Sequence, residues 1–166
     1  MKVWFHRRWC PSGIRPPWVV DEQYDWLWVY AAVEPTTGES LFLFLPSMES
    51  RCFERFLEEL RASFEGKRLG VVLDNAPSHR SGSVHWPDSL SPIALPSYSP
   101  ELNPAEQVFR HLRKILSNRI FETLEQLSEA LTQALREFWE NPSVLARLTG
   151  YPWWKQGISY IPSSSS

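Results

Sequence analysis

Residues 69–74, LGVVLD, constrain the fold of this chain more than any other stretch. The run is apolar until its last residue, it is too short for a buried helix, and a polar loop follows it at once. Such a run is typical of a central β-strand that is covered on both faces. We therefore expect Asp74 at the carboxyl end of a strand, which is where sites gather in α/β sheets.

Three further runs predict the neighbouring strands. Residues 24–33 and 39–46 are rich in aromatic and β-branched residues and flank the turn sequence EPTTG, so they predict a buried hairpin. Residues 91–96, SPIALP, predict a short strand that ends at Pro96. Residues 1–20 contain CPSGIRPP, whose prolines exclude a helix interior there.

Apolar residues at helical spacing predict three helices. The first covers residues 49–64. The second begins with Asn103 as N-cap, Pro104 at the first helical position and Glu106 at the third, and runs to about Leu116. The last helix extends from Thr123, which caps it, to Trp139, and the sequence ENPS breaks it. This order of elements predicts an α/β fold with a mixed sheet flanked by helices.

Composition excludes several classes of protein. A length of 166 residues predicts one domain. Cys10 and Cys52 are far apart in the sequence and lack metal-site spacing, which favours a reducing, cytoplasmic setting. The apolar runs are too short to span a membrane, so we expect no membrane partner. A net charge of −2 indicates that any contact with nucleic acid depends on local patches.

Asp74 and Glu106 are the candidate metal ligands, although each has an ordinary structural explanation. Asp74 could bond its own backbone in an Asx turn. Glu106 could face the helix dipole in the first turn, a contribution of roughly 0.5–1 kcal/mol. If the two carboxylates meet, they provide the oxygen ligands that Mg²⁺ or Mn²⁺ prefers.

Two strings taken together resemble a known family. VVLDNAPSHRS followed by IALPSYSPELNPAEQVFRHLRK is similar to the catalytic core of DDE (Asp-Asp-Glu) transposases of the mariner superfamily, in particular its bacterial insertion-sequence branch. The resemblance covers residues 4–154. It implies a ribonuclease H-like fold in which three carboxylates hold two divalent metal ions, Mg²⁺ or Mn²⁺, and cut and rejoin DNA strands at transposon ends.

The resemblance also assigns roles by position. Asp74 matches the second catalytic Asp and Glu106 the final Glu, with thirty-one residues between them. Asn75 and His79 match the family's DN...H motif and are expected behind the metal ligands or beside a phosphate. The implied partners are double-stranded DNA at transposon ends, a second copy of the chain or a full-length transposase. A basic patch could face the DNA, or it could be an ordinary solvated helix face: Arg110, Arg113, Lys114 and Arg119.

One catalytic residue of the family has no match. Its first Asp lies on the first strand, ahead of the W..P.G.RP sequence, and Met1 stands only a few residues before that point. Asp21, Glu22 and Asp25 fall in a variable linker and are poor substitutes. The family's N-terminal helix-turn-helix is also unmatched. We therefore expect a truncated catalytic domain over residues 1–154 that lacks its first strand, a flexible tail over residues 155–166, and weak or absent activity of the isolated chain.

Two alternatives remain open. The chain could be a non-catalytic transposase remnant that acts as a DNA- or protein-interaction module. A weaker alternative is a general metal-dependent nuclease of the same fold, which would prefer RNA–DNA hybrids.

Overall fold

The computed structural model describes residues 26–74, 84–96, 99–152, 154 and 156. The predictions for residues 1–25, for Asn75 and His79, and for the tail apart from Gln156 lie outside the described residues. The elements are, in chain order, β1 (Trp28–Val33), β2 (Ser40–Leu45), α1 (Ser50–Ser63), β3 (Leu69–Leu73), β4 (Leu90–Ala94), the 3₁₀ helix η1 (Pro100–Leu102), α3 (Ala105–Leu116), α4 (Leu124–Glu140) and α5 (Pro142–Thr149).

The predicted hairpin is confirmed. β1 and β2 pair antiparallel along their whole length, from Trp28 opposite Leu45 to Val33 opposite Ser40. The carboxylate of Glu34 organises the turn between them by accepting hydrogen bonds from Thr36 and Thr37. Gly38, at a φ of +81°, completes the turn in a backbone conformation that side chains rarely adopt.

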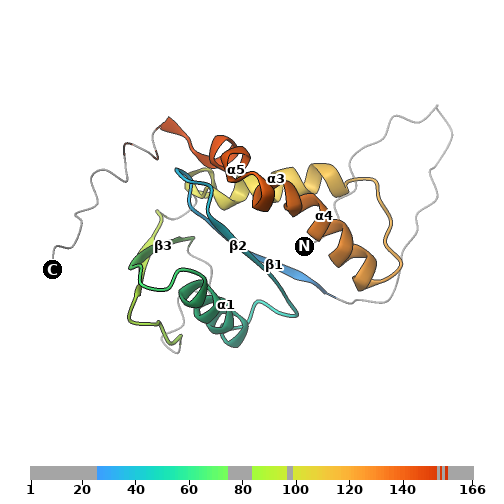
Figure 1. Ribbon diagram of the computed structural model, residues 1–166. Helices are drawn as coiled ribbons and strands as arrows, with labels where there is room; N and C mark the ends of the chain where they lie inside the picture. Colours follow the sequence, from blue (N-terminus) through green and yellow to red (C-terminus); the bar gives the residue numbers. More distant parts are fainter. Residues whose placement is uncertain (1–25, 75–83, 97–98, 153, 155, 157–166) are drawn as a thin grey trace.

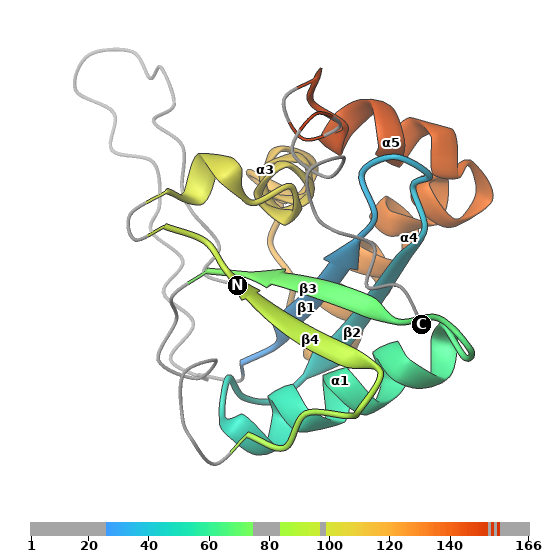
Figure 2. The ribbon, with the colours of Figure 1, turned by 90° about the vertical axis from the view of Figure 1, so that its left-hand side faces the viewer.

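The hairpin lies between α1 on one side and α3, α4 and α5 on the other (Figures 1 and 2). It separates two hydrophobic cores, because side chains alternate between its faces. On one face Phe42 packs with α3, α4 and α5, around the fully buried Leu112, Leu131 and Leu135. On the other face Tyr30 packs with α1 and β4, around Phe53, Phe56, Leu57, Leu60 and Leu90. Both cores therefore include side chains of the β1–β2 hairpin.

The mixed α/β class is confirmed, but a single continuous sheet is not. In the described part of the chain β1 pairs with β2 and β3 pairs with β4, which makes two two-stranded sheets. β3 and β4 run parallel, with Leu69 opposite Leu90 and Leu73 opposite Ala94. β3 is therefore not the fully covered central strand that its sequence predicted, since Gly70 is exposed and the other four residues are half-buried.

The helices agree with the predicted ones at both ends of α1 and α4 to within one residue. Thr123 caps α4, its hydroxyl accepting a hydrogen bond from the Gln126 amide at 3.2 Å. The prediction that α4 is the last helix was wrong. Pro142 breaks α4 but also occupies the first position of α5, where a missing N–H has no consequence. No helix in the described ranges has the length and apolar character to cross a membrane.

Candidate active site

Asp74 follows the last residue of β3, as its sequence predicted. The strand end is held by a hydrogen bond from the Leu95 amide to the Leu73 carbonyl at 2.8 Å, which continues the ladder to β4 by one residue. Asp74 is exposed and lines a cavity of about 560 Å³. The sheet thus presents this carboxylate at its open end.

Glu106 lies in the first turn of α3 and lines the same cavity. The helix begins one residue later than predicted, with Pro104 at the N-cap and Ala105 as the first helical residue. Asn103 still supports this start, because its side-chain oxygen accepts a hydrogen bond from the Ala105 amide at 3.0 Å. The preceding 3₁₀ helix η1 is fastened from the far end of the chain, where the Trp154 indole donates to the Leu102 carbonyl at 3.0 Å. The local hydrogen bond of Asn103 and the long-range hydrogen bond of Trp154 thus both support the position of Glu106.

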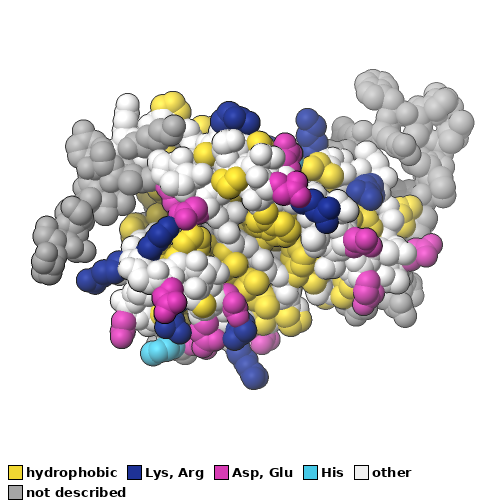
Figure 3. Space-filling view, viewed as in Figure 1, with side chains coloured by type: hydrophobic (Ala, Val, Ile, Leu, Met, Phe, Trp, Pro, Cys, Tyr) yellow, Lys and Arg dark blue, Asp and Glu magenta, His cyan; other side chains and the backbone are white. Residues whose placement is uncertain are grey.

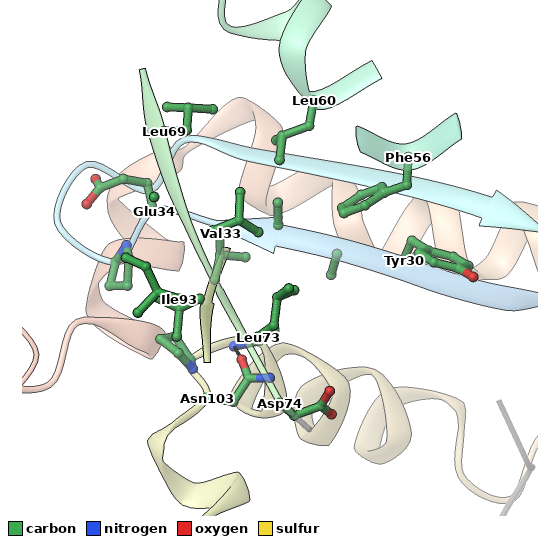
Figure 4. A pocket seen from close by; sticks show the side chains of 18 of the residues that line it. Tyr30, Val33, Glu34, Phe56, Leu60, Leu69, Leu73, Asp74, Ile93 and Asn103 are labelled. Carbon is green, nitrogen blue, oxygen red and sulfur yellow. Dashed lines mark hydrogen bonds between the residues drawn. The ribbon is translucent and has the colours of Figure 1, made fainter. Parts of the chain in front are cut away.

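The cavity runs between the two small sheets. All of β1 and β3 lines it, and residues of α1 and α3 also contribute. Figure 4 shows Asp74 and Asn103 at one end and Glu34 and Leu69 at the other. The walls between these ends are apolar, with Val33, Leu73 and Ile93 among them. Asp74 thus lies at the polar end of a cavity that Glu106 also lines.

The predicted basic patch is partly engaged by its own protein. Arg113 contacts the Glu106 carboxylate at 3.4 Å, and Arg110 donates to the Gln107 side chain at 3.2 Å. Arg119 lies over the Phe121 ring, 5.3 Å from its centre. Lys114 is exposed in the last turn of α3. Basic and acidic side chains are intermingled on the face that Figure 3 shows, so a role of these residues in DNA binding remains a prediction.

The carboxylates present fit one hard cation. Mg²⁺ is commonly held by one or two carboxylates and keeps water at its other positions, which matches the pair Asp74 and Glu106. Among the described residues, no group of three or more His, Cys, Asp or Glu side chains could hold a metal. The described donor set is thus one carboxylate short of the triad that the family resemblance implies.

Tyr30 lies on the wall of the cavity and is buried. Burial, with a smaller effect of the nearby Cys52, raises the pKa of Tyr30 to about 12. Its hydroxyl therefore stays protonated near neutral pH and donates to the Ser47 carbonyl at 3.0 Å. This side chain supports the structure and does not act as a base.

Sequence reasoning did not find Tyr30 or Trp154 as cavity residues. Tyr30 lay inside a long apolar run, and Trp154 is fifty-two residues from the carbonyl it binds, so no local pattern marked either one. Asn103 was predicted only as a helix cap, yet it also lines the cavity, near Asp74.

Residues 2–128 match the family model described as DDE superfamily endonuclease. The chain belongs to this superfamily. It is also 34% identical, over 104 residues, to the uncharacterized protein y4pE/y4sA of Sinorhizobium fredii (strain NBRC 101917 / NGR234), a match that covers 61% of this chain and 77% of that protein.

The fold is that of a solved transposase. The structure described as Mos1 transposase paired-end complex with left transposon end is matched with a TM-score of 0.53 and 15% identity over 89% of this chain. The match covers 51% of that transposase, so the chain spans about half of its length. The predicted DDE family and its ribonuclease H-like fold are confirmed, whereas the insertion-sequence branch and the absent first strand stay predictions.

Proposed function

We propose that this chain is the catalytic domain of a DDE transposase, formed by residues 1–154, and that it acts on double-stranded DNA at transposon ends. The observation that carries the proposal is that Asp74 and Glu106, from two separate elements, line the same cavity. Membership of the DDE endonuclease superfamily supports DNA strand cleavage as the reaction.

Asp74 and Glu106 would hold a Mg²⁺ or Mn²⁺ ion. Such an ion, when bound, activates an attacking oxygen and stabilises the charge that develops on phosphate oxygens. The chain itself contributes the placement of the two carboxylates, through the end of β3 and the capped start of α3. Asn75 and His79 are proposed to lie near the phosphate, on the family resemblance alone.

We further propose that the isolated chain is inactive or weak, because the described residues provide two carboxylates where the family uses three. A non-catalytic interaction module remains the second candidate. The unpaired edges of β1 and β3 among the described residues favour it, since such edges are ready to pair with another chain.

Nicking of a supercoiled plasmid tests the two functions. An active site would produce metal-dependent nicks that disappear in Asp74→Asn and Glu106→Gln. Two exposed carboxylates on neighbouring segments provide matched controls, and Asp88→Asn and Glu101→Gln should keep the wild-type rate. An absence of nicks in either metal, together with DNA binding that survives loss of both carboxylates, would favour the interaction module.

A further inference from the structure

The segment in front of α3 is short and weakly bonded by itself. η1 has three residues, and the Leu102 amide donates to the Ser99 carbonyl at 3.1 Å. Short 3₁₀ helices have poorer hydrogen-bond geometry than α-helices. The N-cap of α3 is Pro104, whose side chain has no oxygen that could cap the helix. Beyond the bond of Asn103, the position of Glu106 therefore depends on contacts from elsewhere in the chain.

Trp154 provides such a contact from fifty-two residues away. Its indole N–H donates to the Leu102 carbonyl at 3.0 Å, at the end of η1. An indole can donate a hydrogen bond but not accept one, so this bond orients the ring toward the backbone in front of α3. Trp154 also lines the cavity together with Asn103 and Glu106. The indole thus links the C-terminal part of the described chain to the start of the helix that carries Glu106.

Short-range hydrogen bonds connect Trp154 to the end of α5. The Gly150 amide donates to the Ala146 carbonyl at 2.8 Å and closes the helix. The Tyr151 amide donates to the Thr149 carbonyl, and the Trp154 amide donates to the Tyr151 carbonyl, both at 3.0 Å. These bonds hold the C-terminal strap, which is made up of the described residues Gly150, Tyr151, Pro152 and Trp154.

α5 gives the C-terminal strap a fixed base. Leu145 and Thr149 are fully buried, and the Thr149 hydroxyl donates to the Leu145 carbonyl at 2.8 Å. Gly150 lies against the turn of the β1–β2 hairpin, which Figure 2 shows beside α5. A Cβ on Gly150 would be 2.6 Å from the Pro35 carbonyl oxygen and 2.4 Å from that of Ala146, so this approach of the backbone requires glycine. The end of α5 is therefore seated on the hairpin turn.

We propose that Trp154 is a positioning residue for Glu106 and that the C-terminal strap transmits the seating of α5 to the start of α3. As far as it concerns metal binding, the proposal rests on the proposed function. A ligand that is already held in place binds with a smaller loss of conformational entropy. Without the indole bond the start of α3 would move more, and the Glu106 carboxylate would be near the cation for less of the time. In this role Trp154 contacts neither the metal nor the DNA.

Binding of Mn²⁺ to the full chain, measured by electron paramagnetic resonance of the free ion, tests this role. Trp154→Phe keeps an aromatic ring and removes the N–H donor, so Mn²⁺ should bind about three- to tenfold more weakly. Trp139→Phe makes the same chemical change at an exposed side chain outside the cavity and should leave the affinity unchanged. Any Mn²⁺ binding that remains in Glu106→Gln should not change when Trp154→Phe is added, because Trp154 acts through the carboxylate.

Gly150→Ala tests the C-terminal strap from its other end. The added Cβ would force the end of α5 away from the Pro35 carbonyl, so the affinity for Mn²⁺ should fall about twofold or more, although Gly150 does not line the cavity. Gly66→Ala is the matched control, because it strains the backbone without meeting any atom within 4 Å. This control should lower stability and leave the affinity for Mn²⁺ unchanged.

Three results would overturn the proposal. The first is an unchanged affinity for Mn²⁺ in Trp154→Phe. The second is an equal loss of affinity in Trp154→Phe, Trp139→Phe and Gly66→Ala, which would assign the effect to general stability. The third is an unchanged affinity in Gly150→Ala, which would show that the seating of α5 does not reach Glu106.

Hydrogen exchange separates this proposal from the proposed function. The amides of Ala105, Glu106 and Gln107 each donate a hydrogen bond at the start of α3. In the metal-free chain Trp154→Phe should speed their exchange about threefold or more and leave the amides of α4 unchanged. If this happens but the wild type binds no Mn²⁺, the positioning of Glu106 stands and the metal-dependent endonuclease is refuted. If Mn²⁺ binds through Asp74 and Glu106 but exchange does not change, the metal site stands and the role of Trp154 is refuted.

Discussion

Glu106 is held by weak forces despite its central position. Its contact with Arg113 is long, at 3.4 Å, and the two side chains are 35% and 40% exposed. Exposed ion pairs contribute at most about 1 kcal/mol to stability. The start of α3 depends instead on Asn103 and the helix packing behind it.

Replacing Glu106 should therefore affect metal binding and DNA cleavage much more than the free energy of unfolding. We expect Glu106→Gln to change the free energy of unfolding by less than about 1 kcal/mol, because it removes only the exposed pair. Urea denaturation compared with Glu101→Gln measures this. A loss of several kcal/mol would show that the carboxylate is structural and would weaken its assignment as a metal ligand.

Glu34 provides a pH-dependent contribution to the hairpin turn. Partial burial alone would raise its pKa, but hydrogen bonds from the side chains and amides of Thr36 and Thr37 outweigh burial and lower it below 4.5. A carboxyl whose pKa is lower in the folded state stabilises the fold above its ordinary pKa. This contribution is lost as the pH falls through the lower, folded value.

The corresponding variant is Glu34→Gln. It should be less stable than the wild type at pH 7, and the difference should shrink as the pH falls below about 4.5. Thermal unfolding over a pH series measures the difference, with the exposed Glu65→Gln as the matched control. A constant difference across the series would contradict the role given to the ionised carboxylate.

Among the elements, the hairpin turn is fitted closely against α5. A Cβ atom on Gly38 would overlap the Pro142 carbonyl oxygen, in addition to the strain of its positive φ. Gly66 has a similar φ of +80°, but a Cβ there would meet no atom within 4 Å. The two glycines thus form a natural comparison of strain with and without a clash.

We expect Gly66→Ala to lower the free energy of unfolding by about 1 kcal/mol from strain alone. Gly38→Ala should lower it by roughly 2–4 kcal/mol, since overpacking adds about 1–3 kcal/mol. Urea denaturation of both variants gives the comparison. Equal losses would mean that α5 can move away from the turn.

The cap of α4 is a second test at this scale. Thr123→Ala should lower the free energy of unfolding by about 1 kcal/mol, because the Gln126 amide loses its acceptor. Thr123→Ser keeps the hydroxyl and should restore most of the loss. Chemical denaturation measures both, and an equal loss in Ser and Ala would assign the effect to the methyl group.

Elements with strong local signals could be predicted from the sequence. The hairpin could be predicted because a turn sequence stands between two runs rich in aromatic and β-branched residues. The start of α4 could be predicted because Gln126 follows Thr123 at the spacing of a capping box. α5 was missed because Asn141 and Pro142 were interpreted only as a stop, although Pro is also favoured at the first helical position. Both uses of proline produce the same local sequence.

At the scale of the whole molecule, the sheet pairing lay beyond local patterns. The run LGVVLD correctly placed Asp74 at a strand end, yet β3 has one paired edge in the described chain instead of two. Pairing depends on which strand stands beside another, and a residue pattern records only burial and period. For the same reason the meeting of Asp74 and Glu106 at one cavity rested on resemblance until the fold was known.

The two halves of the molecule should differ in local stability. A two-stranded sheet is marginal by itself, whereas α3 and α4 bury a continuous core. Native-state hydrogen exchange of the chain alone should therefore show protection factors in β3 and β4 at least tenfold below those in α3 and α4. Equal protection would indicate that the β3–β4 sheet is supported by contacts other than those described.

The bond from the Trp154 indole to the Leu102 carbonyl also links the site to the order in which the chain is synthesised. Domains fold from the N-terminus onward during synthesis, so β3 and α3 leave the ribosome before Trp154. The segment in front of α3 can therefore be fastened only when nearly the whole described chain has been made. The position of Glu106 thus gains its long-range support last.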